Sequence, residues 1–440
     1  MILCFALFMA AVVACLTLGK PLVWAILWGL VLFFALGLRR GYSARTLAAM
    51  AWKKGKNALI VVPVFLMIGM VTGLWRSGGT ISFFLYHGLN GIDPNWFVLM
   101  AFLLSAALSF ALGTSYGVCG TAGVVLMTLA RSGGVSVAVT AGAVLSGAYF
   151  GDRCSPMSSC ANLVAACTGT KLYRNVKEML KTALLPTLLT VAFYAVLSLR
   201  NPITEVDPAT LESLRSHFSL TWPVMIPAAM MLVLPLLKLP VKWAMTASAA
   251  SALVISVVVQ GMPLMEALRT AVFGFAPVQG ELSILSGGGL MSMTTASVIV
   301  FVTSLYSGIL EGIEALLPAR KTVEKMAEKI GLFPSMTVVS TLVVMIFCNQ
   351  SVMVIMDEQL MADSYEKRGA GRLERAMDIA NSGVTIAGLI PWSIAISVPL
   401  TMLGAEYSAV PYAALLYLIP LCYLFTRRFF APSQRSWREE

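Results

Sequence analysis

Long apolar stretches follow one another along most of the chain, and short polar connectors separate them. A helix needs about 20 predominantly apolar residues to cross a bilayer. Stretches of this kind lie near residues 1–18, 22–38, 57–75, 94–112, 182–199, 220–238, 243–260, 288–316, 335–349 and 410–428. Membrane-spanning β-barrels instead alternate in shorter strands. The pattern therefore predicts an all-α polytopic membrane protein with about 10–13 transmembrane segments.

Three further apolar regions carry glycine, proline or clusters of serine, threonine and asparagine: 113–130, 134–168 and 376–405. Such residues interrupt a membrane helix, and non-helical backbone is tolerated at membrane depth where it lines a cavity. We therefore expect broken helices or re-entrant hairpins in these regions. Two amphipathic stretches, 42–55 and 262–275, are expected to lie along the membrane interface.

The composition supports this fold class and excludes others. Hydrophobic residues make up 58% of the 440 positions and charged residues 12%, whereas soluble domains carry roughly 25% charged residues. A cytosolic enzyme and a disordered chain are therefore excluded. The formal charge of +10 comes from Lys and Arg residues that lie in the connectors. This distribution follows the positive-inside rule, so the predicted partner is the lipid bilayer and not nucleic acid.

The sequence gives little evidence for a metal site, a disulfide bond or a hydrolase active site. The eight cysteines mostly lie inside apolar stretches and contain no C-x-x-C pair. Segment 113–117 matches G-x-S-x-G by letter, but a nucleophile elbow needs a strand-to-helix turn and a histidine base. The two histidines, His87 and His217, both lie in connectors. We therefore predict that the protein is not an enzyme and has no catalytic residue.

The chain contains two similar halves. Matching residues recur 235 to 239 positions apart: Gly69 and Gly73 match Gly308 and Gly312, Thr114 matches Asn349, Ser146 and Gly147 match Ser382 and Gly383, and Pro156 matches Pro391. In the first half, connectors 39–56 and 171–181 are basic, whereas in the second half connectors 278–287 and 404–410 contain no Lys or Arg. This reversal predicts an inverted-topology repeat with both termini in the cytoplasm.

This interpretation divides the chain into five parts. They are N-terminal transmembrane helices at 1–38, a first inverted repeat at 39–199, a periplasmic linker with connecting helices at 200–260, a second inverted repeat at 261–428 and a cytoplasmic tail at 429–440. The linker is placed outside because it holds the acidic residues Glu205, Asp207 and Glu212.

Asp152 is the most informative single residue. A carboxylate at mid-bilayer costs about 2.5–3.5 kcal/mol on insertion scales, so its presence indicates a function. Gly151 and Pro156 flank the segment where the helix is expected to unwind. Unwound backbone frees carbonyl groups that can coordinate Na⁺ while the carboxylate supplies the countercharge. The alternative is a structural ion pair between Asp152 and its neighbour Arg153.

Polar residues around the predicted breaks extend this site. The predicted ion-binding residues are Asp152, Thr114, Ser115, Ser155, Ser158 and Asn162. The predicted substrate or second-half residues are Ser159, Asn349, Gln350, Asn381, Ser382 and Thr385. The alternative is that these side chains hold helices together through hydrogen bonds. Four other acids are expected at the membrane interface, paired with nearby basic side chains: Glu311, Asp357, Glu358 and Asp378.

At these motifs the sequence resembles the NhaC family of Na⁺/H⁺ antiporters. The resemblance rests on the motifs Gly69–Trp75, Gly113–Gly117, Gly151–Pro156, Gly288–Leu290, Leu310–Gly312, Ser382-Gly383 and Ile390–Trp392. It implies an inverted-repeat carrier of the bacterial inner membrane. Two family carboxylates are replaced, one by Ser159 and one beside the Ser-Gly pair by Asn381. The family is also similar to carriers that exchange malate or lactate.

The resemblance implies a secondary active transporter that exchanges Na⁺ for H⁺ at a site near the membrane midplane. Na⁺ and H⁺ are the expected coupling ions, and no other metal or cofactor is expected. The alternative is a Na⁺- or H⁺-coupled carrier of a small organic anion or amino acid, because the two replaced carboxylates leave neutral groups in the site. A homodimer is compatible with either interpretation.

Overall fold

A computed structural model describes residues 2–91, 93–203, 208–237, 239–277 and 285–430 of the chain. Two sequence predictions lie partly outside these ranges: the acidic linker at Glu205 and Asp207, and the cytoplasmic tail from residue 431 onward. The described residues are almost entirely helical, and their one isolated β-bridge joins Phe275 to Gly287. The all-α prediction is therefore confirmed.

The first part of the chain forms α1 (Ile2–Thr17), α2 (Val23–Arg39), α3 (Ala44–Ser77), α4 (Thr80–Gly91), α5 (Phe97–Leu112), α6 (Ser115–Val118), α7 (Val124–Ser132), α8 (Val137–Cys154), α9 (Ser159–Thr168), α10 (Leu172–Arg200) and α11 (Pro208–His217). The second part forms α12 (Ile226–Leu236), α13 (Val241–Val258), α14 (Leu264–Phe273), α15 (Thr294–Gly312), α16 (Arg320–Ile330), α17 (Leu332–Phe347), α18 (Gln350–Lys367), α19 (Arg372–Asn381), α20 (Gly383–Ile386), α21 (Ile394–Leu403) and α22 (Ala414–Phe430). Short 3₁₀ turns cover Pro94–Trp96, Trp222–Met225, Leu290–Met293, Leu317–Ala319 and Tyr407–Tyr412, and a π-helical turn covers Cys119–Gly123.

Several helices have the length and apolar composition of a membrane span. Among the described residues these are Pro94–Leu112, Leu172–Arg200 and Leu290–Gly312, to which a pair bent by 63°, Val62–Ser77 and Thr80–His87, adds a fourth. Six further apolar helices of 10–17 residues accompany them. The stretch 42–55 is not a separate interfacial helix, because α3 continues without a break from Ala44 to Ser77.

The three interruptions expected from the sequence are present. α5 ends at Leu112, its cap residue Gly113 has a left-handed φ of 67°, and Thr114 then caps α6. α8 ends at Cys154, and a turn closed by the hydrogen bond from Ser158 N–H to the Ser155 carbonyl oxygen separates it from α9. α19 ends at Asn381, where Ser382 has φ −112° and ψ −83°. Glycine and proline lower the cost of such breaks because they do not sustain the regular helix.

Helix boundaries repeat at a constant spacing of 235 residues. α5 covers 97–112 and α17 covers 332–347; α9 covers 159–168 and α21 covers 394–403. Gly113 and Cys348 are both left-handed, with φ of 67° and 55°. Thr114 and Asn349 then cap the following helices. With this spacing Gly308 corresponds to Gly73. The sequence comparison had matched Gly308 to Gly69, which lies about one helical turn before Gly73.

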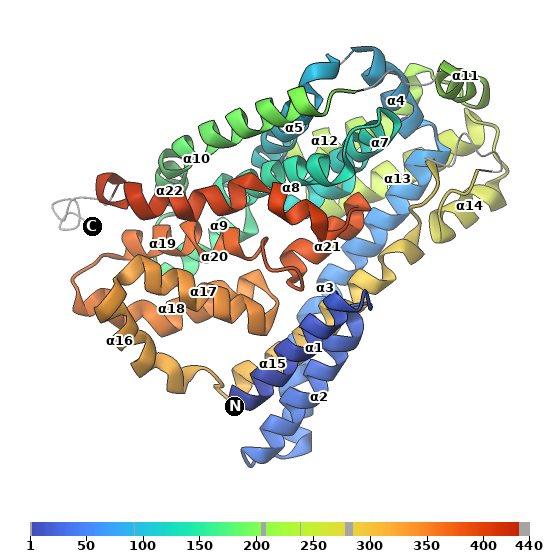
Figure 1. Ribbon diagram of the computed structural model, residues 1–440. Helices are drawn as coiled ribbons and strands as arrows, with labels where there is room; N and C mark the ends of the chain where they lie inside the picture. The colour runs from blue at the N-terminus through green and yellow to red at the C-terminus, as the bar shows by residue number, and fades with distance from the viewer. Residues whose placement is uncertain (1, 92, 204–207, 238, 278–284, 431–440) are drawn as a thin grey trace.

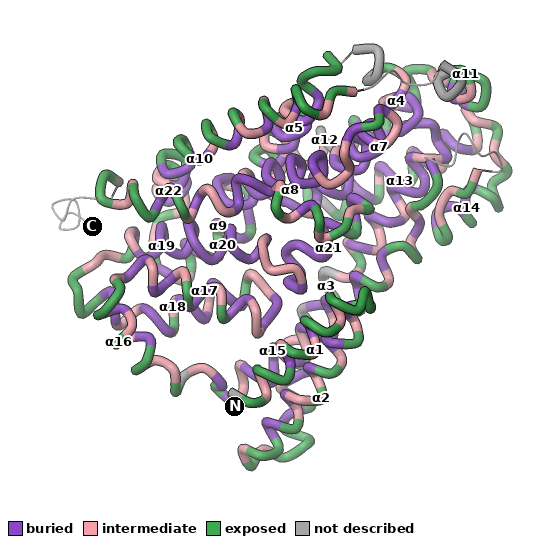
Figure 2. The backbone as a smooth tube through the Cα atoms, viewed as in Figure 1, coloured by how far each residue is buried: buried purple, intermediate pink, exposed green. Residues whose placement is uncertain are grey.

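Figure 1 shows how these helices are arranged. α1, α2, α3 and α15 form one group that extends away from the remainder, and α10 and α22 run beside each other. Figure 2 shows buried backbone through α8 and α20 and exposed turns along the outer side of α10 and α22.

α8 is held in the interior by close contact with α5. A Cβ atom on Gly147 would lie 2.6 Å from the carbonyl oxygen of Phe102, and one on Gly151 would lie 2.0 Å from the carbonyl carbon of Ser109. Small residues at such positions let two membrane helices approach closely. This contact fixes the end of α8, and therefore Asp152.

Candidate functional site

A cavity of about 490 Å³ lies between helices of the two halves, and both halves contribute polar groups to it. Its polar lining consists of Lys54, Thr114, Ser115, Tyr116, Asp152, Ser159, Ser304, Ser307, Asn349, Gln350 and Ser351. Half of the site residues predicted from sequence are in this list: Thr114, Ser115, Asp152, Ser159, Asn349 and Gln350. The two helix breaks after α5 and α17 therefore meet at one cavity, because Thr114 and Asn349 are the cap residues of those breaks.

Asp152 is the carboxylate of this cavity and is only 6% exposed. The polar groups nearest its carboxyl group are the Gln350 and Ser158 side chains and the backbone of Ser115. Its backbone carbonyl accepts a hydrogen bond from Ser158 Oγ. All of these partners are neutral. Within the described chain Asp152 forms no ion pair.

Arg153 does not neutralise Asp152, although it is the next residue and only 1% exposed. Its guanidinium group donates to the carbonyl oxygens of Ala380 (3.2 Å) and Met179 (3.1 Å) and to Thr182 Oγ1 (2.7 Å). A further hydrogen bond goes to Asn381 Oδ1. Adjacent residues on a helix point in different directions. The structure therefore does not contain the Asp152–Arg153 ion pair, which was the alternative interpretation of these residues in the sequence.

The other predicted first-half residues, Ser155, Ser158 and Asn162, stabilise the break between α8 and α9 and do not line the cavity. Ser158 Oγ accepts from the backbone N–H groups of Cys160 (3.1 Å) and Ala161 (3.2 Å) at the start of α9. Ser155 Oγ accepts from the N–H of Met157. Asn162 is exposed, and its amide donates to the carbonyl oxygen of Ser158 at 2.7 Å. Together these contacts fix the turn at residues 155–158 that follows α8.

The second-half residues divide into two groups. Asn349 and Gln350 line the cavity, and Gln350 also donates to the carbonyl oxygen of Val384 at 3.0 Å. Asn381, Ser382 and Thr385 lie outside the lining. Asn381 binds Arg153, whereas the hydroxyl groups of Ser382 and Thr385 donate to backbone carbonyls of their own segment.

Several lining residues were missed by the sequence analysis. Lys54 lines the cavity and forms an ion pair with Glu311 at 2.6 Å. Ser304 and Ser307 line it from α15. The two serines stand three positions apart within an otherwise apolar stretch, so they share one helix face. That spacing was a usable signal for the serines, whereas no sequence pattern links Lys54 to Glu311.

Two acids that were expected at the membrane interface are instead completely buried. Asp357 is 0% exposed, and Ser340 Oγ donates to its Oδ2 at 2.5 Å. Asp378 is also 0% exposed. The expectation rested on the nearby basic connector, but α18 and α19 turn these side chains inward. Glu311 and Glu358 remain partly exposed, with side-chain exposures of 31% and 18%.

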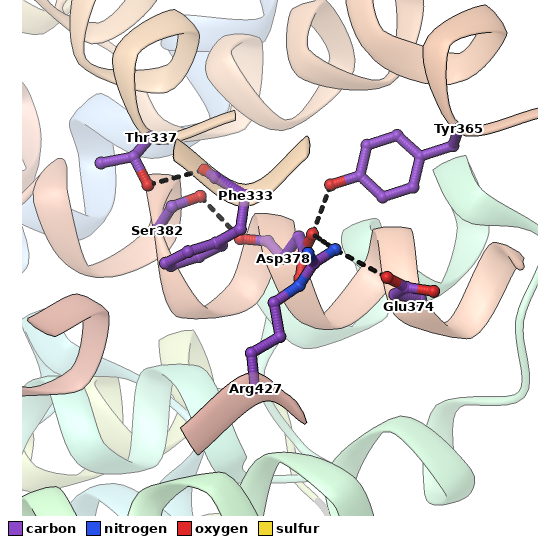
Figure 3. A network of polar contacts seen from close by, with 7 residues as sticks. All are labelled: Phe333, Thr337, Tyr365, Glu374, Asp378, Ser382 and Arg427. Carbon is purple, nitrogen blue, oxygen red and sulfur yellow. Dashed lines mark hydrogen bonds and ion pairs between the residues drawn. The ribbon is translucent and has the colours of Figure 1, made fainter. Parts of the chain in front are cut away.

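Asp378 belongs to a network of charged and aromatic side chains (Figure 3). Arg427 donates to Asp378 Oδ2 at 2.6 Å and to Glu374 Oε1 at 2.7 Å. The hydroxyl of Tyr365 donates to the same Asp378 oxygen at 2.5 Å. Since the carboxylate is neutralised by a cation from α22, this network joins α18, α19 and α22.

Comparison with known proteins supports a transport function. The sequence profile of the Na⁺/H⁺ antiporter family matches residues 1–161 and 147–426. The chain is 28% identical over 385 residues to the malate-2H⁺/Na⁺-lactate antiporter of Bacillus subtilis, covering 86% of this chain and 82% of that protein. It is 28% identical over 367 residues to an uncharacterized Na⁺/H⁺ antiporter of Haemophilus influenzae, covering 80% and 78%.

A third relative transports a different class of solute. The chain is 28% identical over 343 residues to the arginine/ornithine antiporter ArcD of Halobacterium salinarum, covering 75% of this chain and 70% of that protein. Named relatives of the chain therefore exchange inorganic ions, organic acids or amino acids. The family match, together with the apolar helices, shows that this chain is a multi-pass membrane transporter and not an enzyme, and that it belongs to the Na⁺/H⁺ antiporter family.

Proposed function

We propose that the protein exchanges Na⁺ for H⁺ across the membrane and that Asp152 binds the two ions alternately. The observation that carries this proposal is the environment of Asp152: a buried carboxylate that lines a cavity and has neutral partners only. An unpaired carboxylate is costly in this environment, so it is stabilised when a proton or a cation neutralises it.

The groups around Asp152 suit a small cation. The side-chain oxygens of Thr114 and Gln350 belong to the same cavity as the carboxylate. Broken helices in transporters supply further oxygen ligands from unwound backbone. Because one carboxylate provides the charge for both ions, binding of Na⁺ and of H⁺ is mutually exclusive. Competition of this kind is sufficient to couple the two fluxes.

Alternating access is provided, in this proposal, by two repeats of opposite orientation. The constant spacing of 235 residues between helix boundaries supports the repeat, and the reversed charge of the connectors supports the inversion. Rocking of one repeat against the other then exposes the site to either side in turn. Both termini are cytoplasmic in this arrangement.

The test measures Na⁺-dependent proton flux in proteoliposomes. Asp152→Asn keeps the shape of the side chain but removes its charge, and we expect flux to fall by roughly 100-fold because the shared ion ligand is lost. Glu328→Gln, which changes an exposed carboxylate on α16, is the matched control and should leave flux unchanged. Unaltered flux in Asp152→Asn would contradict the proposal.

A second candidate function is the coupled transport of a small organic anion or amino acid. The observation that favours it is the size of the cavity, about 490 Å³, which falls in the range of small-molecule sites and exceeds the needs of one Na⁺. Lys54, Asn349 and Gln350 provide donors there. Counterflow of labelled malate, lactate and amino acids, with and without Na⁺, separates this function from simple ion exchange.

A further inference from the structure

A second cavity, of about 360 Å³, has a lining of different character from the Asp152 cavity. Two arginines line it, Arg76 near the end of α3 and Arg131 near the end of α7. Its other polar groups are neutral. No acidic side chain among the described residues lines this cavity, so the described part of the lining is positively charged.

The two cavities follow one another along the same three helical segments. Phe65 lines the Asp152 cavity and Thr72 lines the arginine cavity, both on α3. On Leu290–Gly312 the corresponding residues are Val300 and Met293, and on α21 they are Ile394 and Thr401. Each pair is seven residues apart, which is about 10 Å along a helix. The cavities therefore lie on opposite sides of one barrier, about two helical turns thick.

The arginine cavity lies near connectors that the charge pattern of the sequence places outside the cell. Arg131 and Gly404 stand at the edges of connectors with few basic residues, whereas Lys54 at the other cavity belongs to the basic connector 39–56. By the positive-inside rule the Asp152 cavity opens toward the cytoplasm and the arginine cavity toward the exterior.

No acid among the described residues neutralises either arginine, and neither is fully hydrogen-bonded within that part of the chain. Arg76 Nη1 donates to the carbonyl oxygen of Thr72 at 3.0 Å, and its Nε is buried without a partner in the described part of the chain. Arg131 Nη2 donates to the carbonyl oxygens of Leu403 and Gly404, both at 2.8 Å. Within the described residues neither forms an ion pair, and the two guanidinium groups repel each other electrostatically. An anion between them would relieve this repulsion and use the remaining donors.

We propose that Arg76 and Arg131 form a binding site for a small carboxylate at the outer entrance of the transport pathway. Guanidinium groups bind carboxylates through paired hydrogen bonds, which favours this chemistry over a simple halide. The volume of about 360 Å³ accommodates an acid of a few carbon atoms. The role of this site as an entrance rests on the proposed transport at Asp152. Binding of a carboxylate to the two arginines is independent of that proposal.

The first experiment measures thermal stability of the purified protein in detergent with malate, lactate, phosphate or chloride at equal ionic strength. We expect malate or lactate to raise the melting temperature in a saturable way. Arg76→Gln and Arg131→Gln should each weaken this effect about tenfold, as expected for losing a charge-assisted hydrogen bond. Arg200→Gln, an exposed arginine at the end of α10, is the control and should leave it unchanged.

A second experiment needs no variant and therefore does not depend on folding of the mutants. Arg76 and Arg131 of the unmodified protein are treated with phenylglyoxal, and mass spectrometry measures their labelling with and without malate. We expect malate to protect these two arginines and to leave Arg200 labelled.

Three results would overturn the carboxylate site: no stabilisation by malate or lactate, equal stabilisation in the arginine variants, or stabilisation by phosphate or chloride alone. Asp152→Asn separates this inference from the proposed function. The variant should keep malate stabilisation even though it loses ion exchange, so failure of one proposal is distinguishable from failure of the other.

Discussion

Asp152 and Asp378 are both buried carboxylates near the ends of helices, yet their surroundings differ. Asp152 lines a cavity and has neutral partners, whereas Asp378 binds Arg427 and the hydroxyl of Tyr365 (Figure 3). A buried carboxylate that is paired with a cation is held in one charged state, because removing either partner leaves an uncompensated charge. A carboxylate without a cation remains available to mobile ions. Burial alone therefore does not select Asp152, and neither does the absence of a cation, because Asp357 is also buried with a neutral partner. The proposal for Asp152 rests on the combination of burial, neutral partners and a place in the cavity lining, from which Asp357 is absent.

The largest expected effect concerns Asp378→Asn. This change removes the buried partner of Arg427 and leaves it only the partly exposed Glu374, so we expect a loss near the lower end of about 3–5 kcal/mol of stability. Denaturant titration or thermal unfolding in detergent measures it. Transport per folded molecule should stay close to that of the unmodified protein. Asp363→Asn, at a partly exposed ion pair with Arg320, is the control and should cost less than about 1 kcal/mol. A strong loss of transport in folded Asp378→Asn would remove the distinction between the two carboxylates.

A smaller effect is expected for Tyr365→Phe. The variant removes one hydrogen bond to a charged acceptor but keeps the Asp378–Arg427 pair, so stability should fall by about 1.5–3 kcal/mol. The same unfolding measurement applies. The change is informative because it leaves the charges untouched. A loss as large as that of Asp378→Asn would indicate that the hydroxyl, and not the cation, holds the network together.

The smallest effects concern the helix caps at the two matching breaks. Thr114→Ala and Asn349→Ala should each cost about 0.5–2 kcal/mol. Asn349→Ala should cost more, because Asn349 accepts from two N–H groups and Thr114 from one. Both should also lower Na⁺-dependent flux, since both residues line the Asp152 cavity. Ser43→Ala, a cap at the start of α3, should cost stability without lowering flux.

The helix breaks and Asp152 could be predicted because each has a local signal. Gly113 and Pro156 interrupt apolar stretches, and a carboxylate far from basic connectors is conspicuous in such a sequence. The match of Thr114 with Asn349 also brought the correct residues together, since it follows the spacing of the helix boundaries.

Other parts of the site depend on helix rotation, which the sequence does not specify. Asn381 and Ser382 stand beside a break like that of Asp152, but Asn381 turns toward Arg153 and away from the cavity. Lys54 and Glu311 are far apart in sequence and meet only because α3 packs against α15. Asp357 was misplaced because nearness to a basic connector does not determine the direction of its side chain.

The contacts of Arg153 have a consequence for how the protein moves. Its side chain reaches from α8 to α10 within the first half and to Ala380 and Asn381 of the second half. All of these bonds lie in the interior, where breaking them without replacement is costly. If the two halves rock against each other as proposed above, the motion is therefore expected to turn about this arginine, so that access to the neighbouring Asp152 changes from one membrane face to the other while Asp152 itself moves little.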